Sequence, residues 1–440
     1  MRQMLMLGMV AFGCAAAFAG NWDKATLKGA TDKANPVAYK VGEPIKFKLL
    51  LEGCDAAGEE LTVVWTRRGD DGKKEDGQSK IVPGQPVEVV TRLDRPGFVR
   101  LEAYVHGADG KDLSRGCNAP GENWFGERRV FFDGGAGVEI EKLRQGAAEP
   151  ADFDAFWRRQ KARLDKVPVK ARRWEVKSPR KELKVYAVQV DCAGPRPVTG
   201  YLSVPVNVAD GKGKCGARVT FDGYGTGVQR APGALWDIWH MEFHINAHGY
   251  DLEKDDAYYK DFFEHTKSNG KGYAFDPVQN GDPEKCYFNG MVLRVLRALQ
   301  YVESLPEWNG HDLQVEGGSQ GGLQTMWAAA LDPKVSKAMP NITWCSDIGK
   351  RGAGRQGSEF EPAYTDALRY YDTVNMAKRV KCEVEVTRAG LGDYTCPPSG
   401  LAVCYNALRC RKSCLWVQGS RHGYIPPKPN QEFKSEAAAR

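Results

Sequence analysis

The sequence has no large excess of charge of one sign, few histidines and no C-x-x-C pair. Its 440 residues carry 62 Lys and Arg against 56 Asp and Glu, a formal net charge of +6, and 7 His. Because both signs are scattered along the chain, this balance does not indicate a nucleic-acid surface. The twelve cysteines also lack the spacing of zinc sites. We therefore expect no nucleic-acid partner and no zinc site built from cysteines, and we expect no cofactor.

Long hydrophobic runs are absent except at the N-terminus. Arg2 precedes an apolar stretch, 4–19, that ends in Ala17-Phe18-Ala19. This run is shorter than the ~20 residues that span a membrane, and A-x-A is typical of signal-peptide cleavage. We expect residues 1–19 to be a signal peptide and the mature protein to be periplasmic or secreted, with no membrane span. An uncleaved anchor and a lipoprotein formed at Cys14 are the alternatives.

The first part of the chain has the pattern of an all-β domain. Apolar and polar residues alternate over 45–52, 61–65 and 99–106, and Gly, Asp and Pro turn signals separate these runs. Short strands at such intervals favour an immunoglobulin-like sandwich, expected over residues 20–134. The glycines at 134–137 and the stretch 146–150 predict a linker over 135–151. No catalytic residues stand out in this domain, so we interpret it as accessory.

Residues 152–440 alternate between strand-like and helix-like segments. Strand patterns cover 183–190, 201–206 and 217–221, and apolar residues over 288–302 fall at helical spacing. Such alternation indicates an α/β fold with a mostly parallel central sheet. A helix is expected to start near Asp152.

The strongest chemical signal is the G-x-S-x-G motif around Ser319. Gly317 and Gly321 flank the serine, a short strand is predicted over 313–316, and a helix over 323–331. A nucleophilic serine on a sharp strand-to-helix turn needs small neighbours at these two positions. The motif therefore predicts the nucleophile elbow of an α/β-hydrolase.

The general base and the acid should follow the nucleophile along the chain. His422 is the only histidine after Ser319, and it follows a strand-like run, 413–417. Asp393 is the preferred acid, because it follows a predicted strand at 382–386 and would lie beside the loop of His422. Asp347 is the second choice, and Asp332, Asp366 and Asp372 are further candidates.

Two backbone amides should form the oxyanion hole. We assign them to Gln320, directly after the nucleophile, and to Tyr224 in the Gly-rich segment after strand 217–221. A rival hypothesis is a metal site made by three histidines spaced by four: His240, His244 and His248. The alternation over 240–247 favours a strand instead, with structural or pocket-lining histidines.

The larger domain resembles the acetyl xylan esterase / cephalosporin C deacetylase family over about residues 152–422. The resemblance rests on DFDAFW at 152–157, TGYLSVP at 199–205, GGSQGG at 317–322 and DYTCPPS at 393–399. It implies Ser319, Asp393 and His422 as the triad, Tyr224 and Gln320 as oxyanion-hole donors, no metal, and acetyl groups on sugar hydroxyls as substrates. It also implies a ring-like homo-oligomer, although the N-terminal domain is additional to compact members.

Three positions depart from the family pattern. Its H-G-Y oxyanion segment begins here with Asp222, its R-G-Q segment is replaced by residues 248–250, and Gly423 stands where an acidic residue often follows the base. The triad stays intact. Trp236, Trp239 and Tyr250 are candidate substrate-binding residues, with core packing as the alternative.

The predicted function is removal of acetyl groups from xylan or xylo-oligosaccharides through an acyl-enzyme. The alternatives are a peptidase, a glucuronoyl or larger-acyl esterase, and a non-catalytic carbohydrate-binding protein.

Overall fold

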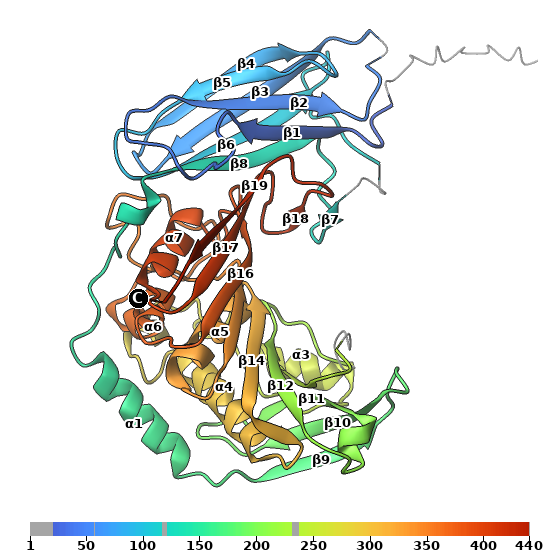
Figure 1. The fold of residues 1–440 in the computed structure, drawn as a ribbon, viewed down its shortest axis with the longest axis vertical. Helices are drawn as coiled ribbons and strands as arrows, with labels where there is room; N and C mark the ends of the chain where they lie inside the picture. Colours follow the sequence, from blue (N-terminus) through green and yellow to red (C-terminus); the bar gives the residue numbers. More distant parts are fainter. Residues whose placement is uncertain (1–20, 57, 117–120, 231–236, 440) are drawn as a thin grey trace, which may run out of the picture.

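The structure, a computed structural model, describes residues 21–56, 58–116, 121–230 and 237–439. Two antiparallel sheets form the N-terminal domain, drawn in blue to cyan in Figure 1, and one has the strand order β1-β2-β5 and the other β4-β3-β6-β8. Their bounds are β1 Thr26–Thr31, β2 Ile45–Glu52, β3 Leu61–Gly69, β4 Lys74–Ile81, β5 Val87–Thr91, β6 Gly97–His106 and β8 Phe131–Val138. Inward residues of both sheets share one core, which confirms the predicted all-β region.

The predicted linker begins too early. Residues 135–138 belong to β8, which pairs with β6 and is buried throughout. A side-chain carbon at Gly135 would collide with backbone carbonyls of Val99 and Leu391, and one at Gly137 would meet Val37 and Phe98. Gly135 leaves room for the backbone at Leu391 of the larger domain, whereas Gly137 packs against residues of its own domain. The connecting segment therefore starts at about residue 139.

A ten-stranded mixed sheet forms the larger domain, in the order β19-β17-β16-β15-β14-β12-β13-β11-β10-β9. Six neighbouring strands, from β13 to β17, run parallel, and the outer strands pair antiparallel. The strands are β9 Ala171–Val176, β10 Leu183–Val190, β11 Val198–Pro205, β12 Cys215–Phe221, β13 Met241–Ile245, β14 Trp308–Gly318, β15 Lys337–Asn341, β16 Glu383–Gly390, β17 Lys412–Val417 and β19 Glu432–Ala437.

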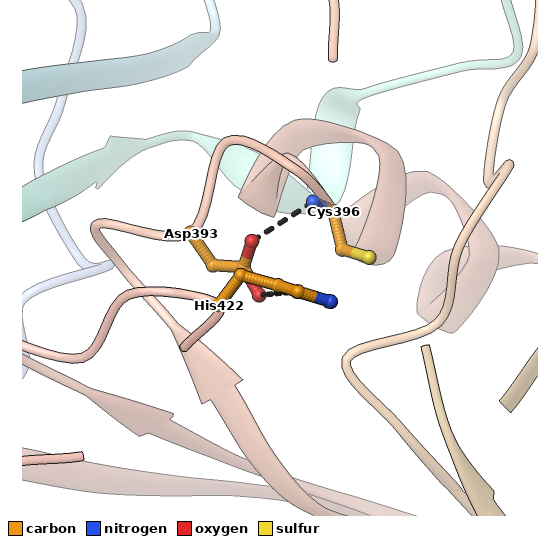
Figure 2. A group of neighbouring side chains, drawn as sticks. All are labelled: Asp393, Cys396 and His422. Carbon is orange, nitrogen blue, oxygen red and sulfur yellow. Dashed lines mark hydrogen bonds and ion pairs between the residues drawn. The ribbon is translucent and has the colours of Figure 1, made fainter. Parts of the chain in front are cut away.

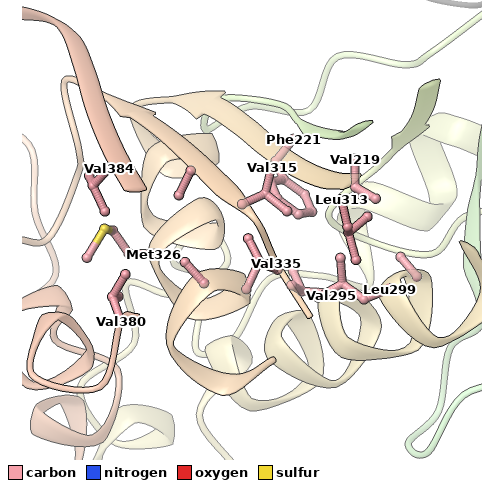
Figure 3. Close-up of a cluster of buried hydrophobic side chains, with 14 of the residues drawn as sticks. Val219, Phe221, Val295, Leu299, Leu313, Val315, Met326, Val335, Val380 and Val384 are labelled. Atoms are coloured by element: carbon pink, nitrogen blue, oxygen red, sulfur yellow. The ribbon is translucent and has the colours of Figure 1, made fainter. Parts of the chain in front are cut away.

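Helices pack on this sheet and bury its apolar residues. They are α1 Phe153–Asp165, α2 Val206–Ala209, α3 Asp256–Glu264, α4 Tyr287–Ser304, α5 Gln320–Leu331, α6 Thr373–Ala377 and α7 Pro398–Ala407, with short 3₁₀ turns at Ile140–Lys142, Gln279–Gly281 and Asp366–Tyr370. Figure 3 shows side chains of β12 and β14 meeting those of α4 and α5 in one buried cluster. The predicted α/β-hydrolase fold is confirmed, with the helices expected at 288–302 and 323–331 present as α4 and α5.

The N-terminal domain packs directly against the loops that follow β16 and β17. Gly135 of β8 exchanges two hydrogen bonds with the Gln418 side chain, at 3.0 and 2.6 Å. Asp133 binds Arg421 at 3.0 Å, and a side-chain carbon at Gly392 would collide with the Asp133 backbone. Both loops following these parallel strands therefore rest on the same strand of the sandwich.

No helix in the described ranges combines the length and the apolar character that a membrane crossing requires. The predicted signal peptide lies outside the described residues. The ten cysteines within those residues are all free thiols, and seven of them are buried.

Candidate active site

Three side chains from three separate loops meet at the carboxyl edge of the parallel strands. Ser319 follows β14, Asp393 follows β16, and His422 follows β17. His422 Nε2 lies 3.1 Å from Ser319 Oγ, and His422 Nδ1 lies 2.9 Å from Asp393 Oδ2. This is the hydrogen-bond chain by which an imidazole can take the proton of a serine hydroxyl.

The loop around Asp393 holds its carboxylate in one orientation. The side chain is fully buried. Its second oxygen, Oδ1, accepts hydrogen bonds from the backbone N–H groups of Thr395 and Cys396, at 3.1 and 2.9 Å. Oδ2 is therefore left for the histidine. A carboxylate fixed in this way selects the tautomer in which the proton is on Nδ1 and the lone pair on Nε2 faces the serine.

Ser319 occupies a strained turn between β14 and α5. Its φ is 58° and its ψ is −119°, a backbone conformation that is costly for a residue with a side chain and that clusters at active sites. Side-chain carbons at Gly317 or Gly321 would collide with the backbone of Gly321 and of Phe221, respectively. The flanking glycines thus allow the close approach of strand and helix that presents the hydroxyl.

The two predicted oxyanion donors, Tyr224 and Gln320, come from the loop after β12 and from the start of α5. Gln320 is the first residue of α5, where backbone N–H groups have no partner within the helix. Tyr224 belongs to the loop after β12 and lines the same cavity as Ser319 and His422. Neither the Tyr224 nor the Gln320 N–H donates a hydrogen bond to another described residue, so both amides are available to a developing oxyanion.

An ion pair supports the loop that carries Tyr224. Asp222 Oδ1 lies 2.8 Å from His244 Nε2 on β13, and Asp222 Oδ2 accepts a hydrogen bond from Gln229 at 2.9 Å. Burial alone would raise the pKa of Asp222, but these hydrogen bonds hold it below its ordinary value. Burial alone would lower the pKa of His244, but Asp222 and the nearby Glu242 raise it above its ordinary 6.5. The pair therefore carries opposite charges at mildly acidic pH.

We expect the contribution of His244 to stability to depend on pH. A raised pKa in the folded state means that the contribution is complete below pH 6.5 and is lost as the pH rises through the folded pKa. The contribution of Asp222 to stability is present above pH 3.8 and is lost in acid, because its pKa in the folded state is lowered. His244→Asn should reduce the free energy of unfolding by about 1 kcal/mol at pH 6, and by less at pH 9.

Urea denaturation at the two pH values measures this difference. The control is His265→Asn, since the His265 side chain is 74% exposed and lies 3.5 Å from Asp261. An exposed pair of this kind should contribute less than about 0.5 kcal/mol at either pH. An equal loss for His244→Asn at pH 6 and pH 9 would contradict the assignment of a charged pair.

Cys396 lies beside the triad and was not singled out from the sequence. Figure 2 shows its thiol next to Asp393 and His422, and potential ligand atoms of the three residues lie within 4.8 Å of one another. Burial raises the pKa of Cys396 well above its ordinary value, so the free thiol carries its proton at neutral pH. The Asp393 and His422 atoms that could bind a metal already bond to each other.

The three histidines of the rival metal hypothesis do not share a site. His240 bonds to Asp237 and Asp312, at 2.7 and 3.0 Å, whereas His244 bonds to Asp222. His248 contacts the Gly225 carbonyl, and burial lowers its pKa to about 3. β13 confirms the predicted strand, so the spacing of four does not align these side chains on one face of a helix.

Asp347, the second choice for the acid, has other partners. It forms a buried ion pair with Arg355 and accepts the Gly146 N–H at 2.7 Å. The structure thus brings Asp393, and not Asp347, to His422.

A cavity of about 670 Å³ opens at Ser319 and His422. Tyr250, a predicted substrate contact, is fully buried in the core beside α3 and does not line it, so this prediction is wrong. Trp239 is 77% exposed but also lies away from the cavity lining, and Trp236 lies outside the described residues. The aromatic residues that line the cavity instead include Trp124 and Phe125, from the N-terminal domain.

Sequence reasoning missed these two aromatics because they lie in a domain without other chemical signals. Their one signal is local. Trp124-Phe125 is an aromatic pair between Gly121 and Gly126, in a polar loop where no strand pattern calls for apolar residues. Both side chains are exposed and line the cavity.

Comparisons with known proteins identify the family of the chain. Residues 137–353 and 355–436 match the model of the acetyl xylan esterase (AXE1) family. Acetyl esterase Axe7A of Xylanibacter ruminicola is 27% identical to this chain over 303 residues. The aligned part covers 65% of this chain and 66% of Axe7A, so the chain spans just under two thirds of the length of that relative.

Two solved structures share the fold. An acetyl xylan esterase from a Paenibacillus species superposes with a TM-score of 0.55 at 25% identity, covering 64% of this chain and 93% of that one. Acetyl xylan esterase 1 from a Thermoanaerobacterium species gives 0.53 at 21% identity, over 64% and 92%. Because the family model matches well over half of the residues, the chain belongs to the acetyl xylan esterase family of carboxylic ester hydrolases.

Proposed function

We propose that the protein is a serine esterase that removes acetyl groups from acetylated xylan or xylo-oligosaccharides. The observation that carries this proposal is the hydrogen-bond chain Ser319–His422–Asp393 at the floor of an open cavity. Family membership and the acetyl esterase names of its relatives support the acetyl group as the acyl part.

In the proposed reaction, Ser319 Oγ attacks the ester carbonyl while His422 Nε2 takes the hydroxyl proton. The Tyr224 and Gln320 amides bind the carbonyl oxygen as it becomes negative. His422 then returns the proton to the sugar oxygen, the C–O bond breaks, and the acetyl group stays on Ser319. A water molecule, deprotonated by His422, attacks this ester and releases acetate and the free serine.

Acetate release from acetylated xylo-oligosaccharides by the full chain tests the proposal. We expect activity on these substrates. The kcat/KM for acetyl esters should be well above that for butyryl esters of the same alcohol and above that for glucuronoyl esters. Peptide substrates serve as the comparison for the peptidase alternative. Hydrolysis of glucuronoyl esters or peptides without acetate release would overturn the acetyl assignment and leave the serine hydrolase chemistry in place.

We further propose that the protein is exported after cleavage at Ala19, because the apolar run 4–19 ends in an A-x-A sequence. Its partner is then an acetylated carbohydrate outside the cytoplasm. A homo-oligomer and the absence of nucleic-acid binding remain predictions from the sequence.

A further inference from the structure

One segment of the N-terminal domain reaches the catalytic cavity. The short strand β7, Glu122–Asn123, pairs with β18, Tyr424–Ile425, which begins two residues after His422. The Trp124 N–H donates to the Gly423 carbonyl at 2.8 Å. These bonds hold the two aromatics after β7 beside the proposed base.

Phe125 lies next to the imidazole of His422. The ring centroids are 6.5 Å apart and the planes differ by 22°. A side-chain carbon at Gly423 would collide with the Phe125 ring. The glycine that replaces the family's acidic residue after the base is therefore what leaves room for an aromatic side chain from the other domain.

Trp124 packs against an arginine at the far side of the cavity. Arg388 lies near the end of β16, lines the cavity together with Ser319, and has its guanidinium carbon 4.9 Å from the centre of the Trp124 ring. Burial lowers the pKa of Arg388, an effect that Asp393 and Glu122 oppose. The guanidinium stays charged at neutral pH even so, because arginine is not deprotonated in proteins.

No ion pair joins the guanidinium of Arg388 to a carboxylate among the described residues, although the charges of Asp393 and Glu122 act on it. Its Nη1 atom is buried without a hydrogen bond. Asp222 and Glu432 also line the cavity, but Asp222 is engaged by His244 and Gln229, and no ion pair joins either carboxylate to Arg388. A guanidinium that lines a substrate cavity and forms no ion pair can bind an anionic group of the ligand.

We propose that Arg388 and Trp124 form a subsite for a carboxylate, so that the preferred substrates are acetylated oligosaccharides that carry a uronic acid near the acetyl ester. The planar guanidinium can bind a carboxylate through two parallel hydrogen bonds. The exposed indole of Trp124, 57% accessible, offers an apolar face to the sugar ring. This inference rests on the proposed function and names its substrate class.

The cavity is large enough for this arrangement. Its volume, about 670 Å³, is within the range of ligand-binding pockets. The acetyl ester would lie at Ser319 and the acidic sugar toward Trp124. The β7 segment thus acts as part of the substrate site and not only as a contact between domains.

The test compares two acetylated xylo-oligosaccharides of equal length, one neutral and one with a uronic acid branch. The wild-type full chain should have a kcat/KM about 10- to 100-fold higher for the acidic substrate at low salt, the gain of a hydrogen-bonded charge pair. Arg388→Gln should bring the ratio of the two values close to one. Arg388→Lys, which keeps the charge but not the bidentate geometry, should give an intermediate ratio.

The matched control is Arg411→Gln. Arg411 precedes β17 at the opposite edge of the sheet, its side chain is 76% exposed, and it lies 3.8 Å from Glu383. This variant should keep the wild-type ratio. A wild-type ratio near one, or a ratio unchanged by Arg388→Gln, would overturn the subsite while leaving the esterase assignment intact. Absence of acetate release from both substrates would instead refute the proposed function itself.

Discussion

Ser319→Ala is expected to lower kcat for acetate release by about 10⁵- to 10⁶-fold, the loss seen when a serine nucleophile is removed from a triad. The variant keeps the elbow, because alanine adds no atom to the strained turn at φ 58°. KM should change little, because the hydroxyl contributes to the transition state more than to ground-state binding. Steady-state acetate release, checked against the melting temperature of the variant, measures the effect.

The matched control for this variant is Ser336→Ala. Ser336 lies just before β15, at the edge of the sheet opposite to the site, where its hydroxyl contacts Asp312 at 3.2 Å. Its kcat should stay within about twofold of the wild type, as for surface changes away from function. In the Ser319→Ala background, His422→Ala should cost almost nothing more, because the triad acts as a unit. Residual activity above about 1% would mean that another group is the nucleophile.

Asp393→Asn is expected to lower kcat by about 10⁴-fold with little change in fold. The amide matches the carboxylate in size, but its NH₂ group can face His422 Nδ1 while the oxygen keeps the hydrogen bonds from Thr395 and Cys396. The histidine would then carry its proton on Nε2, where it cannot accept the proton of Ser319. Acetate release by the purified variant and its thermal unfolding give the two readouts.

The comparison variant is Asp347→Asn, because Asp347 is an equally buried carboxylate. Asp347→Asn should lower the free energy of unfolding, because Arg355 would lose its ionic partner inside the protein. The melting temperature should decrease while kcat stays near the wild-type value. The reverse outcome would be a loss of stability in Asp393→Asn and a loss of catalysis in Asp347→Asn. It would show that Asp393 is not the acid of the triad.

The central part of the fold could be predicted because local patterns and tertiary environment agree there. The strand predicted at 183–190 is β10, with the same bounds. The glycines around Ser319 predict the sharp turn that carries the nucleophile. Because the base follows the nucleophile along the chain, His422 is the one histidine that can be the base. These features depend on neighbours in sequence or on a topology that a few strands already define.

The predictions that were wrong depend on contacts between distant segments. Glycines at 134–137 look like a linker, yet they form a strand against which another domain packs. Tyr250 and Trp124 are both aromatic, and only the tertiary fold decides that the first is buried and the second lines the cavity. No sequence motif marks Arg388. Its proposed role depends on contact with the Trp124 ring, which lies about 260 residues earlier in the chain.

The contact of β8 with the loops after β16 and β17 has a consequence for how this chain tolerates change. Gly135 and Asp133 hold Gln418, Arg421 and the turn at Gly392, and these segments carry the acid and the base. Substitutions in the sandwich can therefore impair turnover without touching the hydrolase half. The two domains therefore cannot be exchanged independently. A hydrolase domain joined to a different sandwich would need compensating changes in both catalytic loops to be active.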